Sequence, residues 1–433
     1  MHGQIHTAEQ AIEFLHSRIN YERMSAALSA SDFKLDRMRN LLRHLGDPHL
    51  ATPVVHIAGT KGKGSTAAMV SQILVGAGHC VGLFTSPHLE RFEERIRIDG
   101  VPIEPEELVE FVDQIAQVTT MIDAESGGLK PTFFELTTAL GWLAFRKRRV
   151  RIAVLEVGLG GRLDSTNICR PEVCAITSIS RDHTHILGSR LSQIATEKAG
   201  IIKEGIPVVC GELPAEAEAA VRRIAAEQSA EMTVASSLVA LSGNLIGDHQ
   251  KKNAAVAVAI IEQLRRRGWT VSDEAISAGL RNVTWPARVE VMSRQPLVIL
   301  DAAHNWASCG ALLDSLNSLH KSGRRILIFA TSADKDAAGL LRRLAPEFDT
   351  LILTAFQLNP RALPVAELSR IATQVTARRV HVAADPASAW KAARRLSQSD
   401  SLICVAGSFF LAAELRGLIA EEAGQPVEPA AHG

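Results

Sequence analysis

Short apolar runs alternate with amphipathic stretches along almost the whole chain, and this alternation restricts the possible folds more than any other feature of the sequence. The runs are rich in β-branched residues, which favour strands, and the stretches between them have helical spacing. Strands are expected at 54–58, 80–86, 151–158, 172–179 and 206–211, and again at 296–303, 324–332, 350–356, 378–384 and 401–407. Strands that alternate with helices build parallel sheets covered by helices on both faces, so the sequence predicts an α/β fold.

The length of the chain, 433 residues, exceeds the size at which one hydrophobic core usually stops growing, so two domains are expected. A helix predicted at 249–268 is followed by a stretch, "WPARVEVMSRQP" at 285–296, that holds two prolines and interrupts the alternation. We therefore expect an N-terminal domain at 1–288 with a mostly parallel sheet, a linker at 289–296, and a smaller Rossmann-like α/β domain at 297–433.

Charge and cysteine content narrow the class of protein. The chain has 47 basic and 47 acidic residues, which argues against nucleic acid or an anionic membrane as its main partner. Its six cysteines are scattered and include no Cys-x-x-Cys pair, as in proteins of a reducing compartment. The first residues lack the pattern of a signal peptide, and no apolar segment is long enough to span a bilayer. We expect a cytoplasmic protein.

A glycine-rich loop, "GTKGKGS" at 59–65, lies between a predicted strand and a predicted helix. Only Thr60 and Lys61 separate Gly59 from the Gly62-Lys63 pair, whereas the common nucleotide-binding loop has four residues there. The context still suits a phosphate-binding loop (P-loop), because backbone N–H groups and the start of a helix attract phosphate. A lysine side chain can then reach the outer phosphates, and a serine hydroxyl can reach the nucleotide or its Mg²⁺.

This shortened loop, together with further blocks, resembles the folylpolyglutamate synthase and dihydrofolate synthase family of the Mur-ligase superfamily. The blocks in the first half are "FKLDRMRNLLRHLGDP" (33–48), "GLFTSPHLERFEERIRIDG" (82–100), "PTFFELTTALGWLAF" (131–145), "LEVGLGGRLDSTN" (155–167), "SISRDHTHILG" (178–188) and "IATEKAGIIK" (194–203). In the second half, "DHQKKNAAVA" (248–257), "DAAHNW" (301–306), "SADKD" (332–336) and "AGSFFLAAE" (406–414) are similar to the family's ATP-contacting segments. The resemblance covers nearly the whole chain.

The resemblance implies an ATP-dependent ligase that adds L-glutamate to dihydropteroate or to folates. A carboxylate and an amine do not condense in neutral water, so the γ-phosphoryl group of ATP would first form an acyl phosphate that glutamate attacks. The implied cofactors are ATP and two Mg²⁺ ions. The chain is expected to be a monomer. A Mur-type ligase acting on a cell-wall peptide precursor, and a catalytically inactive nucleotide-binding regulator, remain as alternatives.

The family also implies roles for individual residues. The implied ATP contacts are Gly59, Thr60, Lys61, Gly62, Lys63, Gly64, Ser65, Asn253, Arg288, Asp301 and His304. The implied metal ligands are Ser86, Glu156, His183 and Lys198, the last as a carbamate, and the implied catalytic residues are Lys63, Lys198 and His183. The implied substrate residues are Asp32, Phe33, Lys34, Thr132, Phe133, Phe134, Glu135, Leu163, Asp164 and Ser165. Because ATP contacts come from both halves, the site is expected between the domains.

Several of these residues also have an ordinary structural interpretation. His183 resembles a surface histidine that follows a strand, Lys198 a solvated helix lysine, and Phe133 and Phe134 core residues. Glu156 is different, because a carboxylate inside the apolar run "AVLEVG" would be buried without a partner unless something binds it. The chain departs from the family pattern at Ala287, Ala302 and Trp306, none of which carries chemistry.

Overall fold

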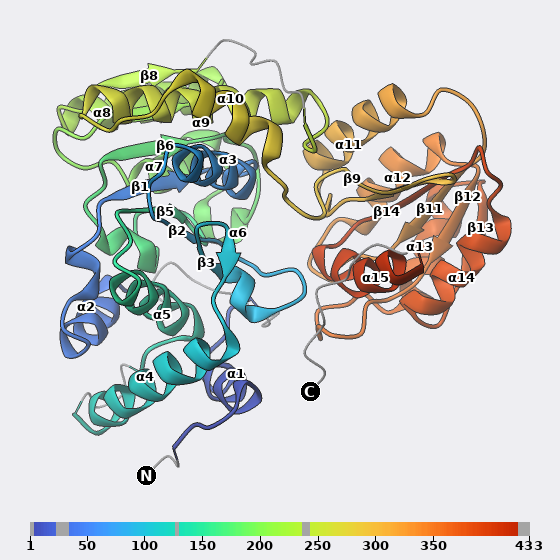
Figure 1. The fold of residues 1–433 in the computed structure, drawn as a ribbon. Helices are drawn as coiled ribbons and strands as arrows, with labels where there is room; N and C mark the ends of the chain where they lie inside the picture. Colours follow the sequence, from blue (N-terminus) through green and yellow to red (C-terminus); the bar gives the residue numbers. More distant parts are fainter. Residues whose placement is uncertain (1–3, 23–33, 126–129, 236–242, 423–433) are drawn as a thin grey trace.

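Two sheets organise the protein, one in each half of the chain (Figure 1). The computed structural model describes residues 4–22, 34–125, 130–235 and 243–422. The expected α/β class, with a large and mostly parallel first sheet and a smaller second sheet, is confirmed.

The first sheet has eight strands in the order β4-β3-β2-β5-β1-β6-β7-β8. Their bounds are β1 Val54–Ala58, β2 Val81–Phe84, β3 Ile96–Ile98, β4 Val101–Pro102, β5 Ile152–Glu156, β6 Val173–Ile176, β7 Val208–Cys210 and β8 Met232–Val234. Neighbouring strands pair in parallel along β2-β5-β1-β6-β7-β8. β3 and β4 pair antiparallel and form one edge of the sheet. Side chains that follow β2, β5, β1 and β6 therefore meet at one edge of the sheet.

Helices cover both faces of the first sheet. The helices of this half are α1 Ala8–His16, α2 Leu35–His44, α3 Lys63–Gly76, α4 Pro105–Glu125, α5 Phe133–Lys147, α6 Thr184–Leu187, α7 Leu191–Ala199, α8 Ala215–Glu227, α9 Asp248–Arg266 and α10 Asp273–Asn282. α3, α9 and α10 pack on the face that carries Val55 and Ile57 of β1. α5 and α7 lie on the other face, and α1, α2 and α4 pack against α5 as an outer layer.

The second sheet has six strands in the order β13-β12-β11-β14-β10-β9. Their bounds are β9 Glu290–Arg294, β10 Leu297–Leu300, β11 Arg325–Phe329, β12 Thr350–Leu353, β13 Arg379–Val382 and β14 Leu402–Ala406. Only β9 is antiparallel to its neighbour. The helices of this half are α11 Trp306–Leu319, α12 Ala337–Leu344, α13 Val365–Val375, α14 Pro386–Leu396 and α15 Phe409–Glu422.

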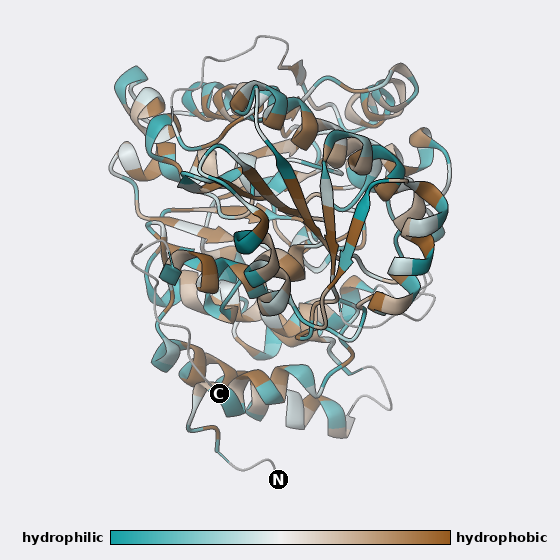
Figure 2. Cartoon of the chain, turned by 90° about the vertical axis from the view of Figure 1, so that its right-hand side faces the viewer, coloured by the Kyte–Doolittle hydropathy of each residue, from teal (hydrophilic) through white to brown (hydrophobic). Residues whose placement is uncertain are grey.

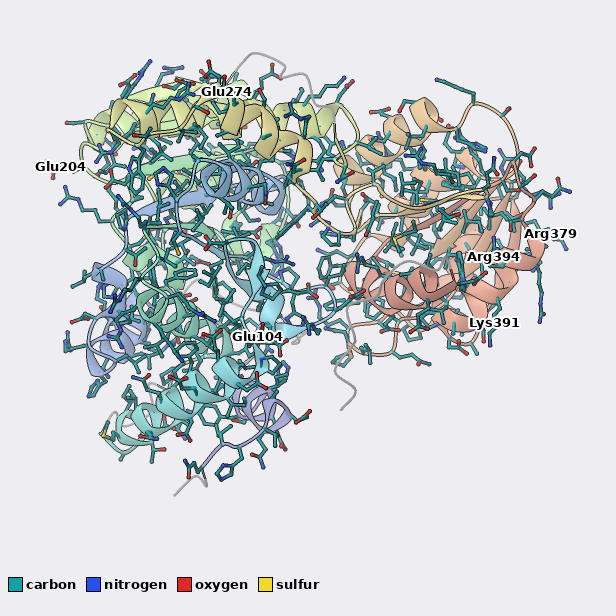
Figure 3. All side chains as sticks on the ribbon, viewed as in Figure 1. Glu104, Glu204, Glu274, Arg379, Lys391 and Arg394 are labelled. Carbon is teal, nitrogen blue, oxygen red and sulfur yellow. The ribbon has the colours of Figure 1, made fainter. Side chains whose placement is uncertain are left out.

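Hydropathy explains this layered arrangement. The strands at the centre of the second domain are largely hydrophobic, while hydrophilic stretches lie mainly on the surrounding helices (Figure 2). Charged side chains such as Glu204, Glu274 and Arg379 are exposed at the periphery of both domains (Figure 3). Within the described ranges, no helix is both long enough and apolar enough to cross a membrane.

The segment expected to link the domains is itself structured. Residues 289–296 contain β9, which pairs with β10 and so belongs to the second sheet. The sequence "EVMSR" does not alternate strictly between polar and apolar residues, and within this strand only Met292 is buried, which fits a strand at the edge of a sheet. The domain boundaries at 288 and 297 stay a prediction.

Candidate active site

The glycine-rich loop connects β1 to α3, as the sequence predicted. Gly62 has φ of 86° and directly precedes α3, and a side chain at this position would collide with Asn253. The loop is held from behind, because the Lys61 N–H donates to Ser178 Oγ at 2.9 Å and the Thr60 N–H donates to the Ser178 carbonyl at 2.8 Å. A fixed backbone that ends in a helix N-terminus is the arrangement that binds phosphate.

A cavity of about 510 Å³, here called the loop pocket, opens in front of this loop. Its lining includes residues 60–65 and all four residues expected to contact ATP from outside the loop, namely Asn253, Arg288, Asp301 and His304. Gly59, the first residue of the loop, does not border the cavity. Elements of both domains thus border one cavity, which has four basic side chains and four acidic ones, namely Lys61, Lys63, Lys252 and Arg288, and Glu156, Asp182, Glu212 and Asp301.

Two of the expected metal ligands meet beside the loop. The Ser86 N–H donates to Glu156 Oε2 at 3.3 Å, and Lys63 Nζ lies 3.9 Å from Glu156 Oε1. Glu156 ends β5 and its side chain is buried, which raises its pKa despite the opposing charge of Lys63. This carboxylate therefore has only weak compensation for its loss of water.

His183 stands in the same cavity but makes different contacts. Its backbone is left-handed, with φ of 48°, and its side chain is 41% exposed, as the surface interpretation expects. The surrounding protein still removes enough water to lower the pKa of the ring to about 4, so the imidazole is neutral near pH 7. The adjacent Asp182 receives Lys61 Nζ at 3.0 Å and lies 3.8 Å from Lys335 Nζ of the second domain. Burial opposes ionisation of Asp182, but the charge of Lys61 lowers its pKa, so this residue is a carboxylate.

His304 follows β10 and faces the loop from the second domain. Its Nδ1 lies 2.8 Å from the Ala302 carbonyl, and its Nε2 lies 3.3 Å from Lys61 Nζ. The charge of Lys61 is the largest cause that lowers the pKa of His304, with burial second, so the ring accepts at Nε2. Asp301 instead holds its own backbone, because it accepts the N–H groups of Val289 and Ala303.

Lys198 does not border the cavity, although the family resemblance implies that it is a metal ligand. It lies on α7, is buried, and donates through Nζ to the Gly59 carbonyl at 3.0 Å. Burial, with the nearby charge of Lys63, lowers its pKa to about 7. The interpretation as a solvated helix lysine is therefore wrong, because this side chain supports the loop from beneath.

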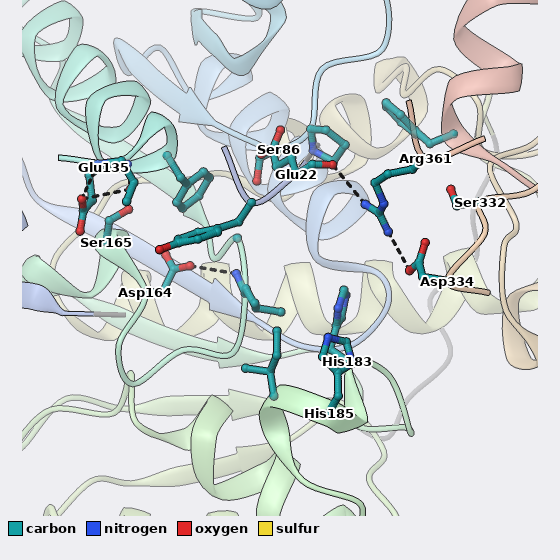
Figure 4. Close-up of a pocket in the computed structure, with 18 of the residues that line it drawn as sticks. Glu22, Ser86, Glu135, Asp164, Ser165, His183, His185, Ser332, Asp334 and Arg361 are labelled. Atoms are coloured by element: carbon teal, nitrogen blue, oxygen red, sulfur yellow. Dashed lines mark hydrogen bonds and ion pairs between the residues drawn. The ribbon is translucent and has the colours of Figure 1, made fainter. Parts of the chain in front are cut away.

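A second cavity, of about 330 Å³, is here called the Asp164 pocket (Figure 4). It is bordered by seven of the expected substrate residues, namely Lys34, Thr132, Phe134, Glu135, Leu163, Asp164 and Ser165. Asp32 and Phe33 lie outside the described residues. Thr132 and Glu135 also form the capping box that begins α5, and Arg37 pairs with Glu135 at 3.0 Å.

Phe133, also expected to contact substrate, does not border the Asp164 pocket. It is buried, and its ring stacks on His16 with centroids 5.1 Å apart. Neighbouring helix residues point about 100° apart, so only Phe134 of this pair turns toward the cavity. The core interpretation is correct for Phe133.

Two blocks of the second domain border the Asp164 pocket, not the loop pocket. Ser332, Asp334 and Lys335 follow β11, and Ser408–Phe410 follow β14. The resemblance had associated both blocks with ATP. Each follows the carboxyl end of a strand on the side of the sheet that faces the first domain, next to the Asp164 pocket.

One contact that borders the Asp164 pocket could not be predicted from the sequence. Arg361 donates to the Glu22 carbonyl at 3.1 Å and pairs with Asp334 at 2.7 Å (Figure 4). Glu22 is held in turn by the buried Arg95, at 2.6 Å. These charged side chains join the first residues of the chain to the second domain.

The two cavities share a wall. Five residues border both, namely Ser86, Pro87, Gly158, His183 and His304. Ligands bound in the two cavities would therefore approach each other at this wall.

Among the described residues, no group of three or more His, Cys, Asp or Glu side chains is spaced to hold a metal ion.

Comparisons with known proteins agree with this geometry. Residues 287–409 match the family model of the Mur ligase glutamate ligase domain. A dihydrofolate synthase/folylpolyglutamate synthase of Bacillus subtilis is 33% identical over 411 residues, covering 88% of this chain and 94% of the relative.

Solved structures are similar over nearly the full length. A folylpolyglutamate synthase of Mycobacterium tuberculosis complexed with ADP and AMPPCP has a TM-score of 0.86 and 31% identity, covering 96% of this chain and 99% of its own. Escherichia coli FolC in complex with DHPP and ADP has a TM-score of 0.84 and 28% identity, covering 98% and 100%. The chain belongs to the dihydrofolate synthase/folylpolyglutamate synthase family.

Proposed function

We propose that this protein is an ATP-dependent ligase that joins L-glutamate to dihydropteroate and to folates. The observation that carries the proposal is the wall shared by the two cavities. A nucleotide on the glycine-rich loop and a carboxylic acid in the Asp164 pocket would direct the γ-phosphate and the carboxylate toward the same residues. Phosphoryl transfer requires this kind of positioning more than it requires covalent help from the protein.

The residues that border the loop pocket have separate tasks in this mechanism. Lys63 holds the outer phosphates of ATP and offsets the charge that develops as the γ-phosphoryl group moves to the substrate carboxylate. The amine of glutamate then attacks the acyl phosphate, forms the amide and releases phosphate. The neutral His304 ring has an acceptor at Nε2, which suits it to orient an N–H or ammonium donor beside the loop.

The residues around Glu156 fit a magnesium site. The buried carboxylate has one backbone donor at 3.3 Å and a lysine at 3.9 Å, which leaves its charge poorly compensated. Ser86, Glu156 and His183 would hold the ion. The oxygens of Ser86 and Glu156 are the hard donors that Mg²⁺ prefers, and His183 would add a nitrogen donor. When bound, Mg²⁺ neutralises phosphate oxygens and polarises the transferred group.

We also propose that Lys198 is carbamylated. A lysine with a pKa of about 7 is partly a neutral amine at physiological pH, and only this form reacts with CO₂. The carbamate would replace a positive charge beneath the loop with oxygens that suit a second Mg²⁺. Lys63 and Lys61, whose charges act on Lys198, would stabilise the anion.

The Asp164 pocket supports activity on both substrates, because dihydropteroate and folates share the same ring system and differ at the end that points to the wall. The test is incubation with ATP, glutamate and either dihydropteroate or a reduced monoglutamate folate, with products separated by mass. Formation of both dihydrofolate and an extended folate is expected. Formation of only one product reduces the proposal to a single activity, and formation of neither rejects it.

Two further points complete the proposal. The protein is proposed to act in the cytoplasm, since the described cysteines are free thiols and five of the six are buried. It is proposed to act as a monomer, because one chain supplies both cavities and their shared wall.

A further inference from the structure

A buried chain of polar side chains runs from the middle of β1 to Asp164. His56 Nε2 lies 2.8 Å from Thr166 Oγ1, and Thr166 Oγ1 lies 2.5 Å from Asp164 Oδ1. On the far side of the ring, His56 Nδ1 lies 3.6 Å from Cys169 Sγ. None of these groups except Asp164 takes part in the mechanism above.

The strand register explains how His56 reaches this place. Val55 and Ile57 of β1 point to the face covered by α3 and α9, so His56 must point to the opposite face. The turn that carries Thr166, Ser165–Ile168, follows β5, which pairs directly with β1. A histidine fully buried in a central strand is costly unless both of its ring nitrogens find partners.

The hydrogen-bond donors around Asp164 determine which group donates and which accepts in the contacts between Asp164, Thr166 and His56. Its Oδ2 accepts the Leu159 N–H at 2.9 Å and its Oδ1 accepts the Thr166 N–H at 3.0 Å. Backbone N–H groups can only donate, so both oxygens act as acceptors and favour the charged form. The Thr166 hydroxyl then donates its single hydrogen to Asp164, and His56 must donate from Nε2.

The pKa values of His56 and Cys169 agree with these hydrogen-bond directions. Burial, reinforced by the charge of Lys203, lowers the pKa of His56 to about 3, and burial raises the pKa of the Cys169 thiol to about 12. The His56 ring is therefore neutral and the Cys169 thiol keeps its proton. Cys169 can then donate to His56, His56 to Thr166, and Thr166 to Asp164. Burial is the largest influence on the Asp164 carboxyl and raises its pKa, while the hydrogen bonds from Thr166 and Leu159 and the charge of Lys63 oppose that rise. Glu156 lies close enough for its charge to interact with that of Asp164.

The geometry points to His56 and Thr166 as positioning residues for substrate recognition, which fix the orientation and the charge of Asp164 from behind the pocket. This inference rests on the proposed function, since it assigns Asp164 to the ring of a pteroate-type substrate. The ring carries an N–H beside an amino group, and an ionised carboxylate can accept both hydrogens.

The first test compares Thr166→Val, which removes the hydroxyl and keeps the shape, with Thr166→Ser, which keeps the hydroxyl. Thr166→Val should raise the KM for dihydropteroate or folate about tenfold, as expected for one lost bond to a charged group, and leave the KM for ATP within about twofold. Thr166→Ser should restore the KM. Thr354→Val is the matched control, because Thr354 is buried and its hydroxyl has no hydrogen-bond partner among the described residues.

Two kinetic results would overturn the inference: an unchanged KM for the pteroate-type substrate in Thr166→Val, or an equal rise in the KM for ATP. If the wild-type protein forms no amide product, the proposed function fails instead. The chain of hydrogens is tested separately on the wild-type protein by ¹⁵N-histidine NMR, with His56→Gln for assignment. A neutral ring protonated at Nε2 is expected, and a ring protonated at Nδ1 would reverse the order and refute the inference even if Thr166→Val does not fold.

Discussion

The loop pocket and the Asp164 pocket adjoin each other but are built in different ways. The loop pocket depends on one contiguous segment whose glycines and backbone N–H groups make the phosphate cradle, with cations added around it. The Asp164 pocket has no such segment, since its wall combines side chains from the segments around α2, the start of α5, the turn after β5 and four separate segments of the second domain. Backbone geometry therefore defines one site and converging side chains define the other.

This difference predicts separable defects, because the two pockets meet only at their shared wall. A change in the loop should impair phosphoryl transfer and spare the binding of the pteroate-type substrate. A change beside Asp164 should do the reverse. Variants that impair both equally would show that the two pockets act as one unit.

The largest effect is expected for Lys63→Ala. Lys63 neutralises charge that matters most in the transition state, so kcat should fall on the order of 10²-fold or more. The affinity for folate, measured by equilibrium binding, should stay near that of the wild type. Lys251→Ala is a suitable control, because Lys251 pairs with Asp248 on the same side of the protein and does not border the cavity. Near-normal turnover of Lys63→Ala would remove the basis for assigning ATP to this loop.

Lys198→Ala should cost roughly tenfold to a hundredfold in turnover, because it removes both the proposed carbamate and the hydrogen bond that Lys198 donates to the Gly59 carbonyl beneath the loop. Short carboxylic acids should restore part of the activity by replacing the missing carbamate. Protein equilibrated with ¹³C-labelled CO₂ should give a carbamate signal that the variant lacks. Because the neutral amine forms as pH rises through about 7, the signal should grow from pH 6 to pH 8.5. A blank wild-type spectrum at high pH, with full activity of the variant, would contradict carbamylation.

The contrast between the pockets also explains what the sequence could predict. Buried runs of β-branched residues mark β1, β5 and β6, and the contiguous loop marks the phosphate cradle. The strands that the sequence missed, β3, β4, β8 and β9, are short or lie at sheet edges, where side chains are partly exposed and the apolar pattern is weak.

Contacts between distant segments leave no local signal. Arg361 and Glu22 are 339 positions apart, and either residue alone resembles a surface charge. The hydrogen bonds that connect His56, Thr166 and Asp164 form because β1 and β5 are neighbours in the sheet. The spacing of residues along the sequence does not reveal which strands are neighbours. Substrate residues were therefore predicted through family resemblance and not from the chemistry of one segment.

A smaller effect is expected for Asp164→Asn, which keeps the shape and removes the charge. The variant should raise the KM for dihydropteroate about tenfold, because a charge-assisted hydrogen bond is roughly twice as strong as a neutral one. Extension of a folate that already carries glutamate should suffer less, since more of its contacts lie elsewhere. The two reactions are compared with the same enzyme preparation at saturating ATP. Equal losses would show that both substrates depend on Asp164 to the same degree.

The smallest effect, and the sharpest test of the shared wall, is expected for Lys61→Asn. Lys61 touches both halves of the site through Asp182 and His304, and its charge is the largest cause that lowers the pKa of His304. The variant should therefore raise that pKa toward the usual value of about 6.5, as measured by NMR titration. The KM for ATP should change only about threefold, because Lys63 still holds the outer phosphates.

The sign of the stability change follows from the same shift. In the wild type the folded pKa of His304 lies below its unfolded value, so the unfolded chain binds more protons once the pH falls below about 6.5. Acidification thus costs the wild type stability, and Lys61→Asn should reduce that cost in urea unfolding at about pH 5.5 relative to about pH 8. Lys252→Gln is the matched control, since Lys252 borders the same cavity, pairs with Glu212 and is not among the charges that act on His304. A His304 pKa that moves equally in both variants would mean that the general positive charge of the loop pocket, and not the Lys61 contact across the domains, keeps this ring neutral.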